Sequence, residues 1–165
     1  MKRSLISLLL CLAAQAAIVP SVSLEELIDQ SEAIVHGRVM RSWSAWDGAH
    51  KYIWTHHLIA VIDPVRGGGP GFVVASEPGG ELDGVGMRFS GALEYAVGEE
   101  AIVFLYRTPI GYLRTTGSGQ GKFTVTGETR VRANLKGLGA ELSALNGLSV
   151  ADFKARVSEA IRRRK

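Results

Sequence analysis

The sequence is poor in cysteine, and its single thiol, Cys11, lies within the first twenty residues. After that position the chain has no cysteine for a disulfide, so a buried core has to hold the fold together. It also has no run of 18 uncharged apolar residues after residue 20, which argues against an integral membrane segment there. With 46% hydrophobic and 21% charged residues, the composition indicates a single globular domain.

The first segment has the order of a signal peptide. Two basic residues precede an apolar run from Leu5 to Ala14, and small residues occupy the two positions that a signal peptidase reads. We expect cleavage after Ala16, so that residues 1–16 are a signal peptide and residues 17–165 form one periplasmic or secreted domain. Because Cys11 follows a leucine, a lipoprotein is disfavoured.

A strong excess of positive charge is missing from the mature domain. Residues 17–165 hold 17 basic and 16 acidic side chains, and the last four residues supply the basic surplus. A nucleic-acid binder would be expected to show a basic stripe on its body, so the sequence predicts no nucleic-acid partner.

Helices are indicated at both ends of this domain. Ser23 and Glu26 form a capping-box pattern that predicts a short helix from Leu24 to Gln30. Ser149 is placed to cap a second helix at about 150–164, whose apolar residues recur at helical spacing. We expect this second helix to pack over a sheet.

Two long β-rich runs follow the first helix. They extend over Ala33 to Trp46 and Lys51 to Ile62 around an Asp-Gly turn, a strong hairpin signal. A strand of 14 residues spans about 45 Å, whereas a compact body of this size is roughly 38 Å across. The strands must therefore bend, and Gly37 is a position where a barrel strand can turn a corner.

Short strands separated by glycine-rich turns fill the middle of the chain. They are expected at Phe72–Ser76, Gly86–Phe89, Ala101–Arg107, Tyr112–Thr116, Lys122–Thr126 and Thr129–Arg132. This spacing favours an antiparallel sheet or barrel over βαβ units. The predicted class is mainly β (α+β), an antiparallel OB-type barrel with a helix before it and a helix after it.

The chain offers little recognisable catalytic chemistry. His36, His50, His56 and His57 come from one expected hairpin, but adjacent strand residues face opposite sides, so His56 and His57 cannot share a metal ion. We expect no metal site, and His57 fits a hydrogen-bonded core histidine. Phe123 stands where a phosphate-binding loop needs serine or threonine, and no Gly-x-Ser-x-Gly occurs, so neither a cofactor nor a catalytic residue is assigned.

Two regions are candidates for binding. Trp46, His50 and Tyr52 surround the expected hairpin turn, where exposed aromatic side chains can anchor a partner or simply close the barrel mouth. Glu77, Glu81 and Asp83 belong to a long glycine-rich loop from Glu77 to Glu94. We expect a non-enzymatic module that binds a protein through these six residues.

A second hypothesis makes the protein an exported hydrolase or metal-dependent enzyme. His50 or His57 would then act together with loop carboxylates, and a cleft that brings one of them within hydrogen-bond reach of Glu81 or Asp83 would favour it.

Four segments also carry a resemblance: Ser31–Val39, Val65–Gly67, Val97–Leu105 and Gln120–Phe123. They resemble segments of small exported bacterial proteins, and their layout over about residues 31–107 is similar to the netrin-like domain of tissue inhibitors of metalloproteinases, an OB-type barrel. The resemblance implies this fold and a protein partner, with an exported protease among the candidates. The animal inhibitors bind the protease zinc through a first cysteine, which the mature chain lacks, so that mechanism does not carry over.

Overall fold

The computed structural model describes residues 20–127, 129–133 and 139–164. The expected signal peptide, residues 1–16, lies outside the described residues. The elements, in chain order, are α1 (Leu24–Gln30), β1 (Ala33–Trp46), β2 (Ile53–Arg66), β3 (Gly71–Pro78), β4 (Gly80–Leu82), β5 (Val85–Met87), β6 (Glu100–Arg107), β7 (Leu113–Thr115), a 3-10 turn η1 (Gly117–Gly119), β8 (Lys122–Thr126), β9 (Arg130–Ala133), α2 (Ala140–Ser143) and α3 (Val150–Arg162).

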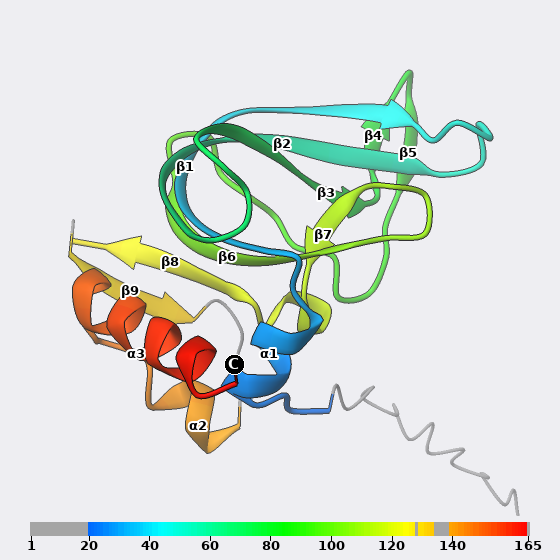
Figure 1. Ribbon diagram of the computed structural model, residues 1–165. Coiled ribbons are helices and arrows are strands. Elements are labelled where there is room, and N and C mark those ends of the chain that lie inside the picture. Colours follow the sequence, from blue (N-terminus) through cyan, green and yellow to red (C-terminus); the bar gives the residue numbers. More distant parts are fainter. Residues whose placement is uncertain (1–19, 128, 134–138, 165) are drawn as a thin grey trace, which may run out of the picture.

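Five strands close into a barrel (Figure 1). Their order is β1-β2-β3-β7-β6, and β6 pairs again with β1, so the sheet meets itself. All of these ladders are antiparallel except β3–β7, which is parallel at Ala75 and Leu113. A closed ring with an odd number of strands cannot alternate in direction all the way round, so one parallel pair is unavoidable. The predicted OB-type barrel between two helices is confirmed.

Bulges bend the two long strands around this barrel. The β1–β2 register shifts at Ile34/Val35, at His36/Gly37 and between Val39 and Arg41. At Gly37 the strands approach so closely that an added Cβ would lie 2.5 Å from Ile59 Cγ2 and 2.6 Å from the Ala60 oxygen. The expectation that Gly37 marks a corner is confirmed.

One bulge changes which residues of β1 share a face. If side chains alternated regularly along β1, Arg41 would lie on the same face of the strand as Val39, and Ser42 would lie on the other face. In the structure Val39 pairs with Ile59 and Ser42 pairs with His57, two residues on the same face of β2, because Met40 is the extra residue of a bulge. Ser42 therefore faces the barrel interior, and Arg41 lies over the Trp43 ring outside it.

Two apolar clusters lie on opposite faces of the sheet. Inside the barrel, apolar side chains of β1, β2, β3 and β6 pack with Leu93 and Tyr95. Outside, Ile34, Ile102 and Phe104 pack with helices α1, α2 and α3 and with β8 and β9. Because β6 contributes to both clusters, Ala101–Leu105 is an unbroken buried run.

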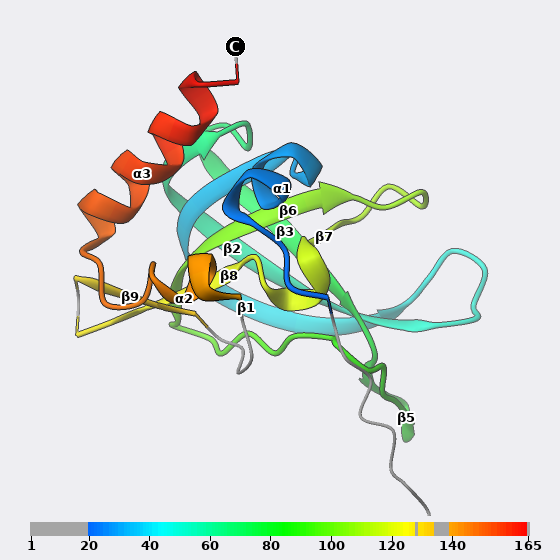
Figure 2. The ribbon, with the colours of Figure 1, turned by 90° about the horizontal axis from the view of Figure 1, so that it is seen from below.

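The helices gather on one side of the barrel and leave the opposite end free. Figure 2 shows α1, α2 and α3 together, while the β1–β2 tip and the β4–β5 hairpin project away from them. The capping boxes expected at Ser23 and the cap at Ser149 are present, and Phe153 and Val157 of α3 are buried. Among the described residues, no helix is long and apolar enough to cross a membrane.

Several strand boundaries differ from the sequence predictions by one or two residues, and two differences are larger. The second long strand begins at Ile53 instead of Lys51 and continues to Arg66, because the Asp47 amide bonds the Tyr52 oxygen at 2.8 Å and keeps residues 48–51 in the turn. The segment after Glu77, expected as a glycine-rich loop with one strand at Gly86–Phe89, contains the β4–β5 hairpin, which turns at Asp83 and Gly84 with left-handed backbone angles.

Replacing Gly37 with alanine is expected to destabilise the fold. The new methyl group would meet the backbone of β2, which cannot move without opening the barrel, and overpacking of this kind costs about 1–3 kcal/mol. Gly48→Ala is the matched control, because no atom lies within 4 Å of its added Cβ. Urea unfolding of both variants checks this, and an equal effect of the two substitutions would contradict the close approach at Gly37.

Candidate functional site

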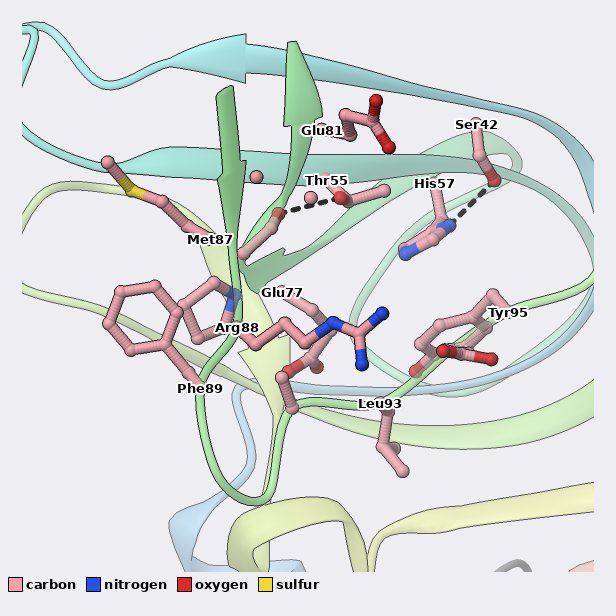
Figure 3. A pocket seen from close by; sticks show the side chains of 16 residues that line it. Ser42, Thr55, His57, Glu77, Glu81, Met87, Arg88, Phe89, Leu93 and Tyr95 are labelled. Atoms are coloured by element: carbon pink, nitrogen blue, oxygen red, sulfur yellow. Dashed lines mark hydrogen bonds between the residues drawn. The ribbon is translucent and has the colours of Figure 1, made fainter. Parts of the chain in front are cut away.

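A pocket opens at the end of the barrel opposite the helices (Figure 3). Its volume is about 630 Å³, and its lining comes from β1, β2, β3, the β4–β5 hairpin and the segment that follows it. The mouth of a small barrel is a common place for a ligand site.

The barrel interior changes from apolar to polar toward this mouth. Along β2 the inward row runs from Ile59 to His57 and Thr55, and on β3 it runs from Ala75 to Glu77. Burying polar side chains costs free energy unless they are hydrogen-bonded, so a polar inner row at one end of a barrel indicates a functional constraint at that end.

His57 is one of the buried polar residues of this inner row. Its side chain is 3% exposed, and its Nδ1 lies 2.7 Å from Ser42 Oγ. Burial, with a contribution from Lys122, lowers the pKa of His57 to about 4. The ring lies against Tyr95, with 4.6 Å between the centroids, and its Nε2 has no hydrogen-bond partner in the described structure. The prediction that His57 is a hydrogen-bonded core histidine is therefore confirmed for Nδ1, while Nε2 lacks a hydrogen-bond partner.

The binding hypothesis requires Glu77 to lie on the surface. The structure corrects this prediction, because Glu77 is buried inside the mouth. It is 2% exposed, and it accepts hydrogen bonds from the Thr115 amide at 3.0 Å and from Arg114 Nε at 3.3 Å. Burial raises the pKa of this carboxyl, although Thr115 and Arg114 oppose the shift. Glu77 therefore joins β3 to β7, where the barrel has only one backbone pair.

The hairpin tip forms one side of the rim. The imidazole ring of His50 stacks on the Trp46 ring, with 6.1 Å between the centroids. The Asp47 carboxylate accepts a hydrogen bond from the Lys51 amide at 2.8 Å. These contacts hold the turn in one shape, which includes a left-handed backbone at His50. Tyr52 remains exposed.

The segment after β3 forms the other side of the rim. Glu81 lies on β4 and lines the pocket, whereas Asp83 lies at the exposed turn of the β4–β5 hairpin and does not. The two sides meet: the rings of Tyr52 and Phe89 are 5.8 Å apart, and the Gly79 amide donates to the Ile53 oxygen at 2.8 Å. Of the six predicted residues, Glu77 and Glu81 line the pocket, whereas Trp46, His50, Tyr52 and Asp83 lie outside its lining.

The four histidines are not brought together. His36 bonds Glu100 at 2.8 Å, His56 bonds Ser76 at 2.8 Å on the outer face, and His57 points inward. In the part of the chain that the structure describes, no three histidine, cysteine, aspartate or glutamate side chains are placed to hold a metal ion.

Two basic residues at this site carry no functional signal in the sequence. Lys122 is buried under the mouth, where its Nζ lies 2.8 Å from Glu99 Oε2, 2.7 Å from the Glu94 oxygen and 4.2 Å from the centre of the Tyr95 ring. Arg88 lines the pocket. Lys122 immediately precedes Phe123, and the local sequence gives no sign that a lysine is buried there. Arg88 follows a short strand and carries no local signal.

The buried neutral His57 predicts a pH dependence of stability. Its pKa is near 6.5 in the unfolded chain and about 4 in the folded protein, so the unfolded state binds more protons between these values. The free energy of unfolding is therefore expected to fall as pH decreases from about 6.5 to 4, by up to about 1.4 kcal/mol per pH unit from this group. Urea unfolding of His57→Asn should lack that contribution. An NMR titration that places the pKa of His57 near 6.5 would contradict it.

No family model matches this chain, and no curated protein matches it either. The netrin-like resemblance remains an expectation from the four quoted segments. Two of them, Ser31–Val39 and Val97–Leu105, contribute to β1 and β6, which pair over Ala33–Arg38 and close the barrel.

Proposed function

We propose that this protein is an exported, non-enzymatic binding module that recognises a protein partner through the rim of its barrel mouth. The rim consists of the hairpin tip, Trp46 to Tyr52, and the segment from Pro78 to Glu94. Export is supported by the signal-peptide pattern of the first sixteen residues.

The observation that carries the proposal is the meeting of these two segments. They are more than twenty residues apart in sequence, yet Tyr52 packs edge-on against Phe89, and the Ile53 amide lies 3.4 Å from Met87 Sδ. Tyr52 is 40% exposed and Phe89 is 39% exposed. Two partly exposed aromatic rings in contact with each other present the kind of large, rigid contact area that anchors protein interfaces.

The resemblance to the netrin-like domain makes an exported protease the first partner to test. The mature chain lacks the cysteine with which the animal inhibitors bind the protease zinc, so any inhibition would have to act through rim contacts. The rim carries charges of both signs, and affinity would then depend on its aromatic anchors more than on net charge.

The hydrolase hypothesis requires a histidine hydrogen-bonded to Glu81 or Asp83. His57 bonds Ser42 instead, and His50 stacks on Trp46. Within the described ranges neither histidine bonds a carboxylate, so the geometry gives this alternative no specific support.

Removing the aromatic anchors is expected to weaken partner binding without unfolding the barrel. The Tyr52→Ala and Phe89→Ala variants should each lower affinity by about tenfold or more, as truncation of an interface anchor does, while the melting temperature changes little. Ile62→Ala is the control, because Ile62 is 53% exposed on the far half of β2.

The partner would be captured from the extracytoplasmic fraction with the wild-type protein, identified, and titrated against all three variants by calorimetry. Loss of binding in Ile62→Ala, or unchanged binding in both rim variants, would remove the rim as the recognition surface.

A further inference from the structure

Three charged side chains line the mouth pocket without a partner. They are Glu81, Arg88 and Glu94, and none of these side chains has a hydrogen bond or an ion pair within the described residues. Glu77 lines the same pocket but differs from these three, because it is paired with Arg114. The pocket therefore presents unpaired charges of both signs to a ligand.

These charges approach the pocket from different sides. Figure 3 shows the Arg88 guanidinium reaching across the pocket toward Tyr95, while the Glu81 carboxylate lies on the other side of His57. The two groups do not meet, since no ion pair joins them. A ligand that carries a negative group and a positive group, held apart, would satisfy both.

Part of the pocket wall is apolar. Met87, Phe89 and Leu93 line the same pocket, and its volume of about 630 Å³ falls in the range of small-ligand sites, about 300–1,000 Å³. Glu81 and Glu94 would repel a polyanion, and a simple cation would leave the Arg88 guanidinium unpaired. An uncharged ligand would displace water from all three charged side chains without forming an ion pair with them, and this desolvation is unfavourable for binding.

We propose that this pocket binds a short peptide with both ends free, which places its carboxylate on Arg88, its ammonium group on Glu81 and its side chains against Met87, Phe89 and Leu93. Guanidinium and carboxylate groups match in a planar, two-bond geometry, and hydrogen bonds between charged groups are the strong ones. The binding is reversible, and no bond is made or broken.

His57 supplies an independent sign that the mouth is built for an occupant. Its Nε2 is buried and has no hydrogen-bond partner, in a ring that lines the pocket. Native proteins rarely leave such an atom unsatisfied. It is covered in the free protein, so a peptide group reaches it only after the side chains around it shift.

This inference extends the proposed function from the rim to the pocket that the rim encloses, and it rests on the same barrel mouth. It requires no protein partner. The peptide experiment therefore gives a result of its own: rim recognition can fail while the pocket binds peptide, and the reverse is also possible.

The probe is the tripeptide alanyl-alanyl-leucine, titrated into the protein by calorimetry at low ionic strength. Its N-acetyl and C-terminal amide forms are the matched ligands, because each removes one charge and keeps the apolar body. We expect the free tripeptide to bind, and each blocked form to bind about tenfold more weakly or worse.

Variants assign each end of the peptide to its side chain. In Arg88→Gln the free tripeptide and its C-terminal amide should bind equally, because the variant has lost the guanidinium that pairs with the peptide carboxylate. In Glu81→Gln the free and N-acetyl forms should bind equally, because the variant has lost the carboxylate that pairs with the peptide ammonium group. Asp83→Asn is the control: it lies on the same hairpin, does not line the pocket, and should bind the tripeptide as the wild type does. Because Arg88 and Glu81 are exposed, both variants should keep the wild-type melting temperature.

Three results would overturn the proposal. The free tripeptide does not bind at concentrations of about 10 mM, the blocked forms bind as well as the free form, or Asp83→Asn loses as much affinity as Arg88→Gln and Glu81→Gln.

Discussion

The fold depends on β1 pairing with two neighbours at once. Ile34–Arg38 forms one ladder with β2 and another with β6, and these two ladders turn a bent hairpin into a closed barrel. Closure gives the sheet an inside and an outside, and both faces bury apolar side chains. The outer face of β1 and β6 carries the helices, and the inner face carries the second cluster. The close approach at Gly37 belongs to the same constraint, because the strands have to bend where they serve both ladders.

The site follows from where the inner apolar row ends. Polar side chains at the mouth are buried as deeply as the core, and each is held by a specific bond: His57 by Ser42, Glu77 by Thr115 and Arg114, Lys122 by Glu99. These bonds offset part of the cost of burial. They also fix the floor of the pocket, while the charges above it, on the β4–β5 hairpin and after it, stay unpaired. A rigid polar floor beneath free charges is suited to binding.

The sequence predicts the parts of this arrangement that local patterns encode. The caps at Ser23 and Ser149, the Asp-Gly hairpin and the opposite faces of His56 and His57 all follow from short-range rules, and the structure confirms them. The bulge at Met40 has no such signal, because the extra residue depends on how β1 wraps the barrel. From the sequence, Glu77 is predicted to be a loop carboxylate in a glycine-rich stretch. Its burial results from the pairing of β3 with β7, which are distant in sequence. Lys122 and Arg88 were missed for the same reason.

Hydrogen exchange along β1 tests barrel closure most directly. In an antiparallel ladder successive amides point to alternate sides, so the amides of residues 34–38 divide between β2 and β6. The account predicts that both sets exchange as slowly as the most protected amides of the protein, because opening either ladder opens the barrel. Fast exchange of the set that points to β6, with slow exchange toward β2, would show an open sheet and would contradict the closed barrel on which the pocket and its rim depend.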